Sequence, residues 1–501
     1  MTSLAAAVQS HRNLRVPFYV LGALLVTAIL CLVGLSFNTG IALVFSISIL
    51  ILYAANKGAG LIAGIIFYLV KAVFVRIAYA FDLHYHTLGN LELLGMAPTL
   101  VLSALIVGNL YLAYSSGQKI APDRTRQYLL FFAGLSFLSI FLPTNSVTIG
   151  LGGFQRNLLP NMLIMFLACS VWREYASRQL LVKTLLLLGI FSCLYGIGQW
   201  FEGLYAWEKG WMLDVALGRG DTGWMTIGLR GIEFRIFSIF YSYMDFFFTN
   251  VAIFALAYAH KGKLDGWWRF TRVLYFIVWG VMLLLSVERM PMLMTLAVIA
   301  VAGLLRKTKE TRRILARRYV IIGVSCYLAL FSIAPILAGT GAETFRRLAE
   351  LANPFAASSI QDRTNSNWGP ALEVIGSHPW GVGIGYGSQT RASDEAQATD
   401  NYVKPHNELL QKLLETGVIG GILFLMILGA LFRSAIRQED GSNGVHPLAA
   451  ALAGLSVAFW LCGIVNLPFS GASGLIYWAL AGFVLADADR RAEEEEACPN
   501  A

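Results

Sequence analysis

The feature that most constrains this chain is a succession of about fourteen apolar runs, most of them long enough to cross a lipid bilayer as helices. Apolar residues make up 57% of the chain and charged residues only 14%, whereas soluble proteins average about 25% charged residues. We therefore expect an all-α, polytopic integral membrane protein with about 12–14 transmembrane helices. The runs lie at 17–37, 39–55, 58–81, 93–114, 127–142, 157–172, 180–201, 236–259, 270–286, 290–305, 318–338, 406–432, 447–465 and 470–487.

The net charge of +8 does not indicate nucleic-acid binding, because the basic residues lie in short connectors and form no stripe on an exposed face. Lysine and arginine accumulate in the cytoplasmic loops of membrane proteins. The short loop that contains Arg306, Lys307, Arg312 and Arg313 therefore predicts that both chain termini are cytoplasmic.

Two connectors are long, and under this orientation both fall on the outer side. The first contains Trp207, Trp211 and Trp224, which suggest amphipathic pieces at the membrane interface. In the second, residues 342–351 and 368–376 predict short amphipathic helices, and GVGIGYG predicts a tight turn or a close backbone approach. The predicted regions are N-terminal transmembrane helices (1–201), an outer amphipathic loop (202–235), central transmembrane helices (236–338), a long, partly helical outer loop (339–405), C-terminal transmembrane helices (406–487) and a cytoplasmic acidic tail (488–501).

The segment that begins HNELLQKLLETG at His406 has a polar and an apolar helical face. Glu408, Gln411, Lys412 and Glu415 share one face, and leucines occupy the other. The apolar run after this segment is only about 22 Å long as a helix, so a membrane span must include part of the polar half. One interpretation is that the polar face contacts protein or a water-filled cavity, with His406 at the start of the helix. The alternative is that the segment lies at the membrane interface and His406 is merely solvated.

Three arginines map to the outer side, namely Arg235, Arg289 and Arg363. Arginine at membrane depth costs about 2.5–3.5 kcal/mol on insertion scales, and carboxylates, carbonyls or phosphates compensate for it. Several guanidinium groups around one site would bind a pyrophosphate. The simpler alternatives are an ion pair of Arg289 with Glu288, and side chains that extend from helix ends to water.

Lys71 and Arg76 lie inside the third apolar run. Charged residues inside the apolar runs of membrane proteins usually have a functional role. Lys71 and Arg76 either contact an anionic lipid headgroup or pair with Asp245 of the eighth run. The residues alone leave both alternatives open.

No metal or cofactor site is expected. Asp82, His84 and His86 form a small cluster, but no further ligands occur at metal-binding spacing. The six cysteines show no metal or redox spacing, and the glycine run does not follow a strand as in a dinucleotide site.

Four segments resemble, in the same order, motifs of the O-antigen ligase and Wzy-type polysaccharide polymerase superfamily. The resemblance covers residues 235 to about 425. The second segment departs from the usual Ser-Arg pair, because Val287 and Glu288 separate Ser286 from Arg289. The segments are RIFSIFYSYMDFF from Arg235, SVERMPML from Ser286, RTNSNWGPALEVIGSHPWGVGIGYG from Arg363 and HNELLQKLLETGVIGG from His406.

The resemblance implies a metal-independent glycosyltransferase in the bacterial inner membrane. Such an enzyme takes a glycan from undecaprenyl pyrophosphate on the periplasmic face and transfers it to an acceptor sugar hydroxyl. Histidine suits this chemistry, because its ordinary pKa of about 6.5 lets it accept a proton at neutral pH. The implied roles are catalysis for His406 and pyrophosphate binding for Arg235 and Arg289, with Arg363 assisting from the loop. Separately from the resemblance, the candidate supporting residues are Asn407, Glu408, Gln411, Lys71 and Arg76.

The preferred hypothesis is a polymerase of surface or exopolysaccharide repeat units, because the predicted spans outnumber those usual in ligases and a second large outer loop is present. The alternatives are a ligase that transfers the glycan to lipid A-core, transfer to protein, and a transporter or flippase. No internal repeat of the kind common in transporters is evident. Expected partners are the lipid-linked oligosaccharide, an acceptor glycan, the bilayer, and chain-length regulator or flippase proteins; nucleic acid is not among them.

Overall fold

The structure is a computed structural model dominated by helices. In its described part the only strands are two short ones, so the predicted all-α class and polytopic membrane architecture are confirmed. The structure describes residues 37–81, 88–118, 120–142, 146–171, 175–211, 225–228, 231–234, 236–260, 266–286, 288–308, 310–318, 364–386, 403, 405–438 and 444–497.

Every predicted apolar run within the described residues contains a helix, while most of the runs at 17–37 and 318–338 lies outside them. The helices are α2 (Phe37–Ala55), α3 (Lys57–Phe81), α4 (Leu88–Ser115), α5 (Arg124–Leu138), η1 (Ser139–Phe141), α6 (Val147–Gly153), η2 (Phe154–Met162), α7 (Ile164–Val171), α8 (Tyr175–Glu202), α9 (Ala206–Trp211), α10 (Tyr243–Ala259), α11 (Gly266–Ser286), α12 (Arg289–Leu305), η6 (Thr364–Trp368), α16 (Gly369–Ser377), α17 (Glu408–Arg437), α18 (Pro447–Gly463) and α19 (Gly471–Ala497).

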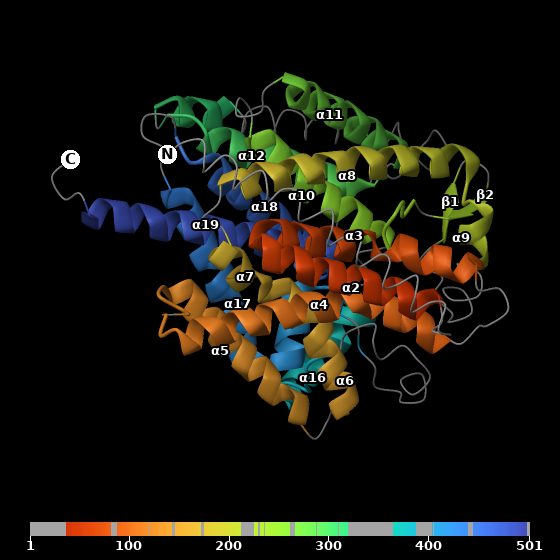
Figure 1. The fold of residues 1–501 in the computed structure, drawn as a ribbon, viewed down its shortest axis with the longest axis horizontal. Coiled ribbons are helices and arrows are strands. Elements are labelled where there is room, and N and C mark those ends of the chain that lie inside the picture. The colour runs from red at the N-terminus through yellow and green to blue at the C-terminus, as the bar shows by residue number, and fades with distance from the viewer. Residues whose placement is uncertain are drawn as a thin grey trace.

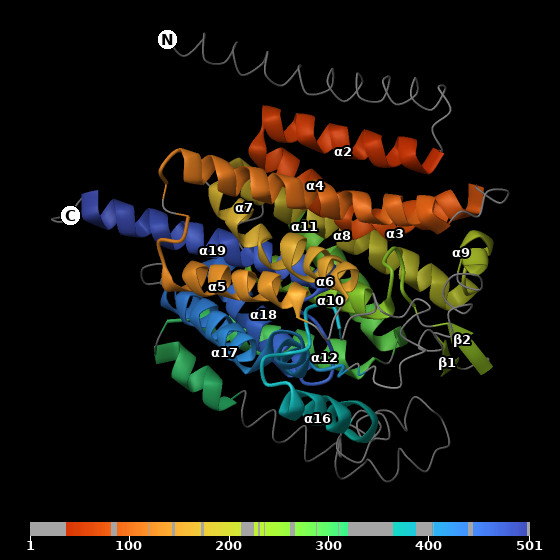
Figure 2. The same cartoon turned by 90° about the horizontal axis from the view of Figure 1, so that it is seen from below.

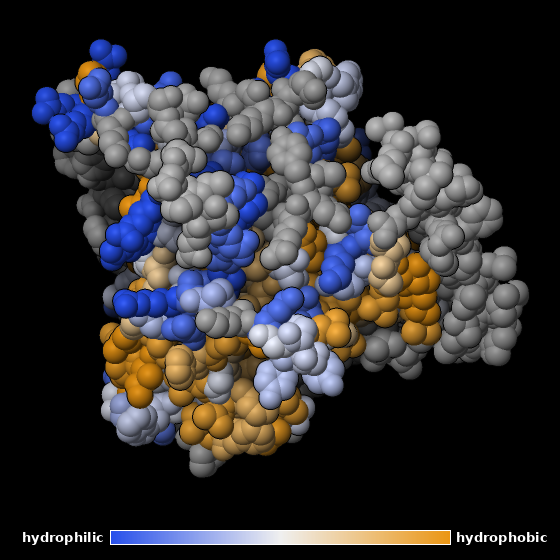
Figure 3. All heavy atoms as spheres, turned by 60° about the vertical axis from the view of Figure 1, so that its left-hand side comes forward, coloured by the Kyte–Doolittle hydropathy of each residue, from blue (hydrophilic) through white to orange (hydrophobic). Residues whose placement is uncertain are grey.

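Six of the described helices are long and apolar enough to cross a membrane, namely α3, α4, α8, α11, α17 and α19. The helices α2, α10, α12 and α18 contain shorter apolar segments. Large apolar side chains such as Phe131 and Leu284 are more than two-thirds exposed. Figure 3 shows hydrophobic residues gathered in broad areas separate from the hydrophilic ones, as expected where lipid replaces water around the helices.

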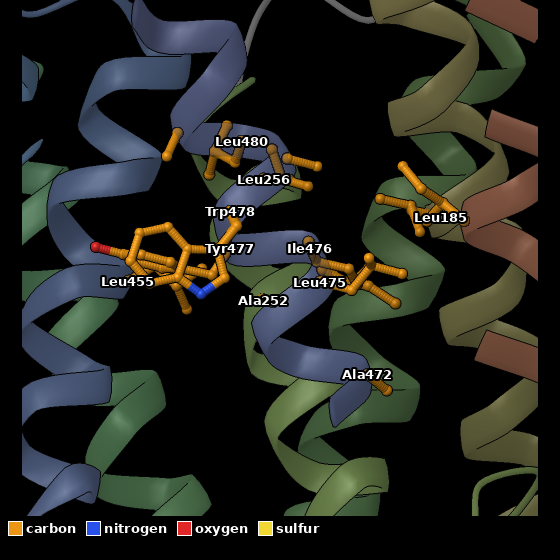
Figure 4. Packing of buried hydrophobic residues seen from close by; sticks show 14 of the residues in the cluster. Leu185, Ala252, Leu256, Leu455, Ala472, Leu475, Ile476, Tyr477, Trp478 and Leu480 are labelled. Carbon is orange, nitrogen blue, oxygen red and sulfur yellow. The ribbon is translucent and has the colours of Figure 1, made fainter. Parts of the chain in front are cut away.

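The helices lie side by side along the long axis of the molecule (Figures 1 and 2). The most enclosed membrane-length helix is α19, whose span is 83% buried and which packs against α7, α10 and α18. Figure 4 shows Leu475, Tyr477 and Trp478 of this helix among side chains of α8, α10 and α18. The first part of this helix, residues 471–486, has no charged side chain, and a helical segment that is hydrophobic on all sides is buried in a protein core or in a membrane.

The bundle has two ends, and hydrogen bonds identify which helix termini meet at each. At one end, the Asn407 side chain just before α17 donates to the Ile464 carbonyl just after α18, at 2.9 Å. We call this the His406 end. At the other, the Val445 N–H just before α18 donates to the Leu305 carbonyl at the end of α12, at 2.8 Å. We call this the opposite end.

The described part of the predicted outer loop 202–235 is structured. It contains α9 and an antiparallel hairpin of β1 (Met225–Gly228) and β2 (Gly231–Phe234), grouped together in Figure 1. Trp211 and Glu208 of α9 are both buried in protein, and Glu208 forms a long-range ion pair described below. The interface position expected for these amphipathic pieces stays a prediction.

Candidate active site

His406 lies at the start of α17 in an unusual backbone conformation. Its φ angle is +47°, and only His406 and Ser238 combine a positive φ with a side chain among the described residues. Left-handed backbone costs about 1–3 kcal/mol for a non-glycine residue and persists only where the surroundings enforce it, often at functional sites. The residue is partly exposed, between the buried Pro405 and the helix cap Asn407.

The polar face predicted for this segment is buried in protein. Glu408, Gln411, Lys412 and Glu415 are each at most 4% exposed. Lys412 forms an ion pair with Glu408 at 3.3 Å, and the Gln411 amide donates to a Glu415 carboxylate oxygen at 3.2 Å. Burial of this face excludes a helix that merely lies on the membrane surface, because such a helix leaves its charged side in water.

The helix α17 is interrupted at Gly417, whose φ is +72°. The break leaves backbone groups of both halves without helical partners, and the segment 379–386 after α16 bonds to them. The predicted close approach of the glycine-rich turn is thereby confirmed, and so is the predicted helix at 368–376, as α16. The bonds run from Val382 N to Leu414 O (2.8 Å), from Gly383 N to Glu415 O (3.1 Å) and from Val418 N to Pro379 O (2.9 Å).

The same turn also contacts the helix junction of α6 and η2. The Gly385 N–H donates to the Glu415 carboxylate at 3.1 Å, and a side chain on Gly153 would come within 2.4 Å of the Gly385 Cα. Neither glycine has room for a side chain. The segment 379–386 is therefore joined, through Glu415, to the helix that His406 precedes.

A substitution at the break tests this packing. In Gly417→Ala, the new Cβ would lie 2.5 Å from the Trp380 carbonyl carbon, on a backbone that disfavours side chains. We expect a loss of more than about 1 kcal/mol in stability, measured as a lower unfolding temperature in detergent. The matched control is Gly429→Ala in the same helix, where nothing lies within 4 Å, so stability should be unchanged or slightly higher. Equal effects of the two variants would contradict the packing account.

Arg289 begins α12 at the same end of the bundle as His406. The helices α12 and α18 are antiparallel and each is 17 residues long. Since Leu305 at the end of α12 bonds to Val445 before α18, the first turn of α12 lies toward the end of the bundle where α18 ends. The adjacent Ile464 is the residue to which Asn407 bonds.

Arg235 and Arg363 lie outside the described residues, and so do Asp82, His84 and His86. The segment that follows Arg235 is described. It carries the left-handed Ser238, and its backbone is held by Arg76. Within the described residues, no group of three or more metal-binding side chains occurs.

Arg76 is completely buried and joins α9 and the segment before α10 to α3. Its Nη1 lies 2.6 Å from a Glu208 carboxylate oxygen and 2.9 Å from the Ser238 carbonyl, and its Nη2 donates to the Phe240 carbonyl at 2.8 Å. Glu208 also accepts hydrogen bonds from the side chains of Tyr195 and Gln199. Of the alternatives for Arg76, the structure therefore shows an ion pair, with Glu208 in place of Asp245.

Lys71 interacts electrostatically with Asp245. Its ammonium is 3.9 Å from the centre of the Tyr68 ring, a cation–π contact. Asp245 accepts hydrogen bonds from the Ser242 hydroxyl at 3.0 Å and from the Ala472 N–H at 3.4 Å. These contacts join α3, α10 and α19 at the His406 end.

The sequence patterns missed Glu208 as the partner of Arg76. In the sequence, Glu208 is distinguished only by its position between Trp207 and Trp211. Nothing in that pattern points to Arg76, which lies more than 130 positions earlier.

Comparison with known proteins agrees with the motifs. No curated protein matches the chain. Residues 274–425, from α11 to the second half of α17, match the family model described as O-antigen ligase. This segment includes Arg289, Arg363 and His406. The match at residues 274–425 supports the resemblance of the chain to the O-antigen ligase and Wzy superfamily.

Proposed function

We propose that the protein is a glycosyltransferase that polymerises repeat units of a surface or exopolysaccharide, with an undecaprenyl-pyrophosphate-linked glycan as glycosyl donor. The observation that carries this proposal is the position of His406. It has a strained backbone, adjoins a buried polar helix face, shares one end of the bundle with Arg289 and belongs to the O-antigen ligase domain. Strained residues and buried polar groups are costly, and function is a common reason for their presence.

In the proposed reaction, a hydroxyl oxygen of the acceptor sugar attacks the anomeric carbon of the glycosyl donor. The bond from this carbon to the pyrophosphate oxygen breaks, and undecaprenyl pyrophosphate leaves with the bonding electron pair. His406 accepts the hydroxyl proton. Arg235, Arg289 and Arg363 stabilise the negative charge that grows on the leaving group. No step requires a metal or another cofactor.

In this proposal, the supporting residues near His406 have a different role from Lys71 and Arg76. Asn407, Glu408 and Gln411 shape the start of α17 around His406. Lys71 contributes positive charge at the same end, and Arg76 supports the segment that follows Arg235.

In the proposed orientation, the His406 end faces the periplasm, both chain termini are cytoplasmic, and the protein lies in the bacterial inner membrane. The distribution of basic residues supports this orientation. The loop after α12, which contains Arg306 and Lys307, lies at the opposite end, and such loops are typically cytoplasmic. The regions 1–201, 202–235, 236–338, 339–405, 406–487 and 488–501 remain the proposed division of the chain.

A second candidate function is ligation of the glycan to lipid A-core. The description of the matching family, O-antigen ligase, favours it. Both functions share the glycosyl donor and the proposed roles of His406 and the arginines, and differ only in the acceptor.

An assay with purified protein separates these functions. Given only lipid-pyrophosphate repeat units, the protein should release undecaprenyl pyrophosphate and produce a ladder of longer glycans, measured by gel electrophoresis and mass spectrometry. A chelator should not reduce the yield. If product forms only after addition of lipid A-core, the ligase hypothesis replaces the polymerase. Movement of substrate across vesicles without any new glycosidic bond would instead indicate a transporter or flippase.

A further inference from the structure

The side chain of Asn407 bonds to the ends of two helices at once. Its Oδ1 accepts a hydrogen bond from the Leu410 N–H at 2.9 Å, in the first turn of α17. Its Nδ2 donates to the Ile464 carbonyl at 2.9 Å, at the C-terminal end of α18. A helix leaves the first N–H groups and the last carbonyls without partners inside it. One carboxamide therefore caps α17 and joins it to α18.

The α18–α19 turn, which contains Ile464, is itself firmly packed. Glu408, the residue after Asn407, accepts a hydrogen bond from the Phe469 N–H of this turn at 3.3 Å. The Phe469 ring is 3% exposed, and its centroid lies 4.9 Å from that of Tyr477. The Phe469 carbonyl accepts a hydrogen bond from the Trp478 indole at 3.1 Å. Asn407 thus connects α17, at the protein surface, to a turn that Phe469 anchors in the core.

His406 is the residue whose position depends most directly on this connection. It precedes Asn407, and its left-handed backbone needs external support. Because both polar atoms of the Asn407 side chain have partners on different helices, the peptide that links it to His406 has a defined orientation.

We propose that Asn407 is a positioning residue for the transfer reaction, and that the hydrogen bond from its Nδ2 to Ile464 orients the His406 imidazole toward the acceptor hydroxyl. The inference rests on the proposed role of His406 as the base. The positioning role requires a side chain that has both a hydrogen-bond acceptor and a hydrogen-bond donor, and the Asn407 carboxamide provides both. An ionised carboxylate has only acceptors, and alanine has neither.

The decisive variant is Asn407→Asp. Aspartate caps helices as well as asparagine does, so the bond from Leu410 survives, whereas the bond to Ile464 is lost. The Asn407→Ser variant also keeps a capping oxygen, adds no charge, and is too short to reach both partners. In both variants we expect wild-type insertion and unfolding temperature, and a kcat about 10–100-fold lower, since small misplacements of a catalytic group cost this much. KM for the lipid-linked glycan should change less than about twofold, because glycan binding does not need the oriented imidazole.

The matched control is Asn56→Asp. The Asn56 Oδ1 also accepts a hydrogen bond in the first turn of a helix, from the Ala59 N–H at 2.7 Å, but at the start of α3 and away from His406. This variant should keep wild-type kcat. The same loss in the control would show that helix capping in general, and not the connection to Ile464, affects turnover.

The outcomes distinguish this inference from the proposed function. A wild-type kcat in Asn407→Asp or in Asn407→Ser overturns the positioning role. If a variant without an imidazole at position 406 remains active, the proposed function itself fails. If that variant is inactive and Asn407→Asp turns over normally, only the role of Asn407 is rejected.

Discussion

Substitution of His406 should reduce glycan transfer by about 100- to 10,000-fold, the range over which a positioned general base accelerates a reaction. The variant His406→Asn is preferable to His406→Ala. Asparagine tolerates the left-handed backbone at this position, whereas alanine adds a conformational cost to the loss of the imidazole. The measurement is kcat in the ladder assay, with insertion and unfolding temperature recorded for the same preparations.

The structure provides a matched histidine as control. His378 follows α16, is exposed, and its ring bonds to the adjacent Ser377 hydroxyl at 2.9 Å. The variant His378→Asn should keep wild-type activity. The wild-type activity should also fall as the pH drops below neutrality, because a protonated imidazole cannot accept the hydroxyl proton. Normal turnover by His406→Asn would remove this residue as the base.

The second large effect is expected from the buried ion pair of Arg76 and Glu208, both completely buried. Arg76→Met leaves a buried carboxylate without its counter-charge and three carbonyls, those of Ala72, Ser238 and Phe240, without their guanidinium donor. Removal of one partner of a buried pair typically costs about 3–5 kcal/mol. We expect a destabilisation of this order, measured by SDS titration of the protein in mixed micelles, together with reduced transfer because the segment after Arg235 loses its support.

The control for this effect is the exposed ion pair of Arg490 and Glu494 near the C-terminal end of α19, at 3.0 Å. Water and salt screen such a pair, so Arg490→Met should change stability little. The double variant Arg76→Met/Glu208→Gln should recover part of the stability, because it no longer buries an unpaired charge. Equal, small effects at Arg76 and Arg490 would contradict the account of a buried pair that joins α9 to α3.

Much of the helical architecture follows from local sequence. The apolar runs predicted the helices within the described residues, and the polar positions of Glu408, Gln411, Lys412 and Glu415 predicted a single helix face. Both patterns depend on helical periodicity and on transfer of side chains from water to lipid. These properties are determined by residues within one or two helical turns of each other.

The sequence also contained the motifs that the family comparison supports, and with them His406 and Arg289 as candidates. How these residues are supported depends on long-range contacts that local sequence patterns do not predict. The pairing of Arg76 with Glu208, the contact of segment 379–386 with the break at Gly417, and the bond from Asn407 to Ile464 all connect distant parts of the chain. Such partners depend on which helices pack together, and the spacing of residues along one helix carries no information about a neighbouring helix.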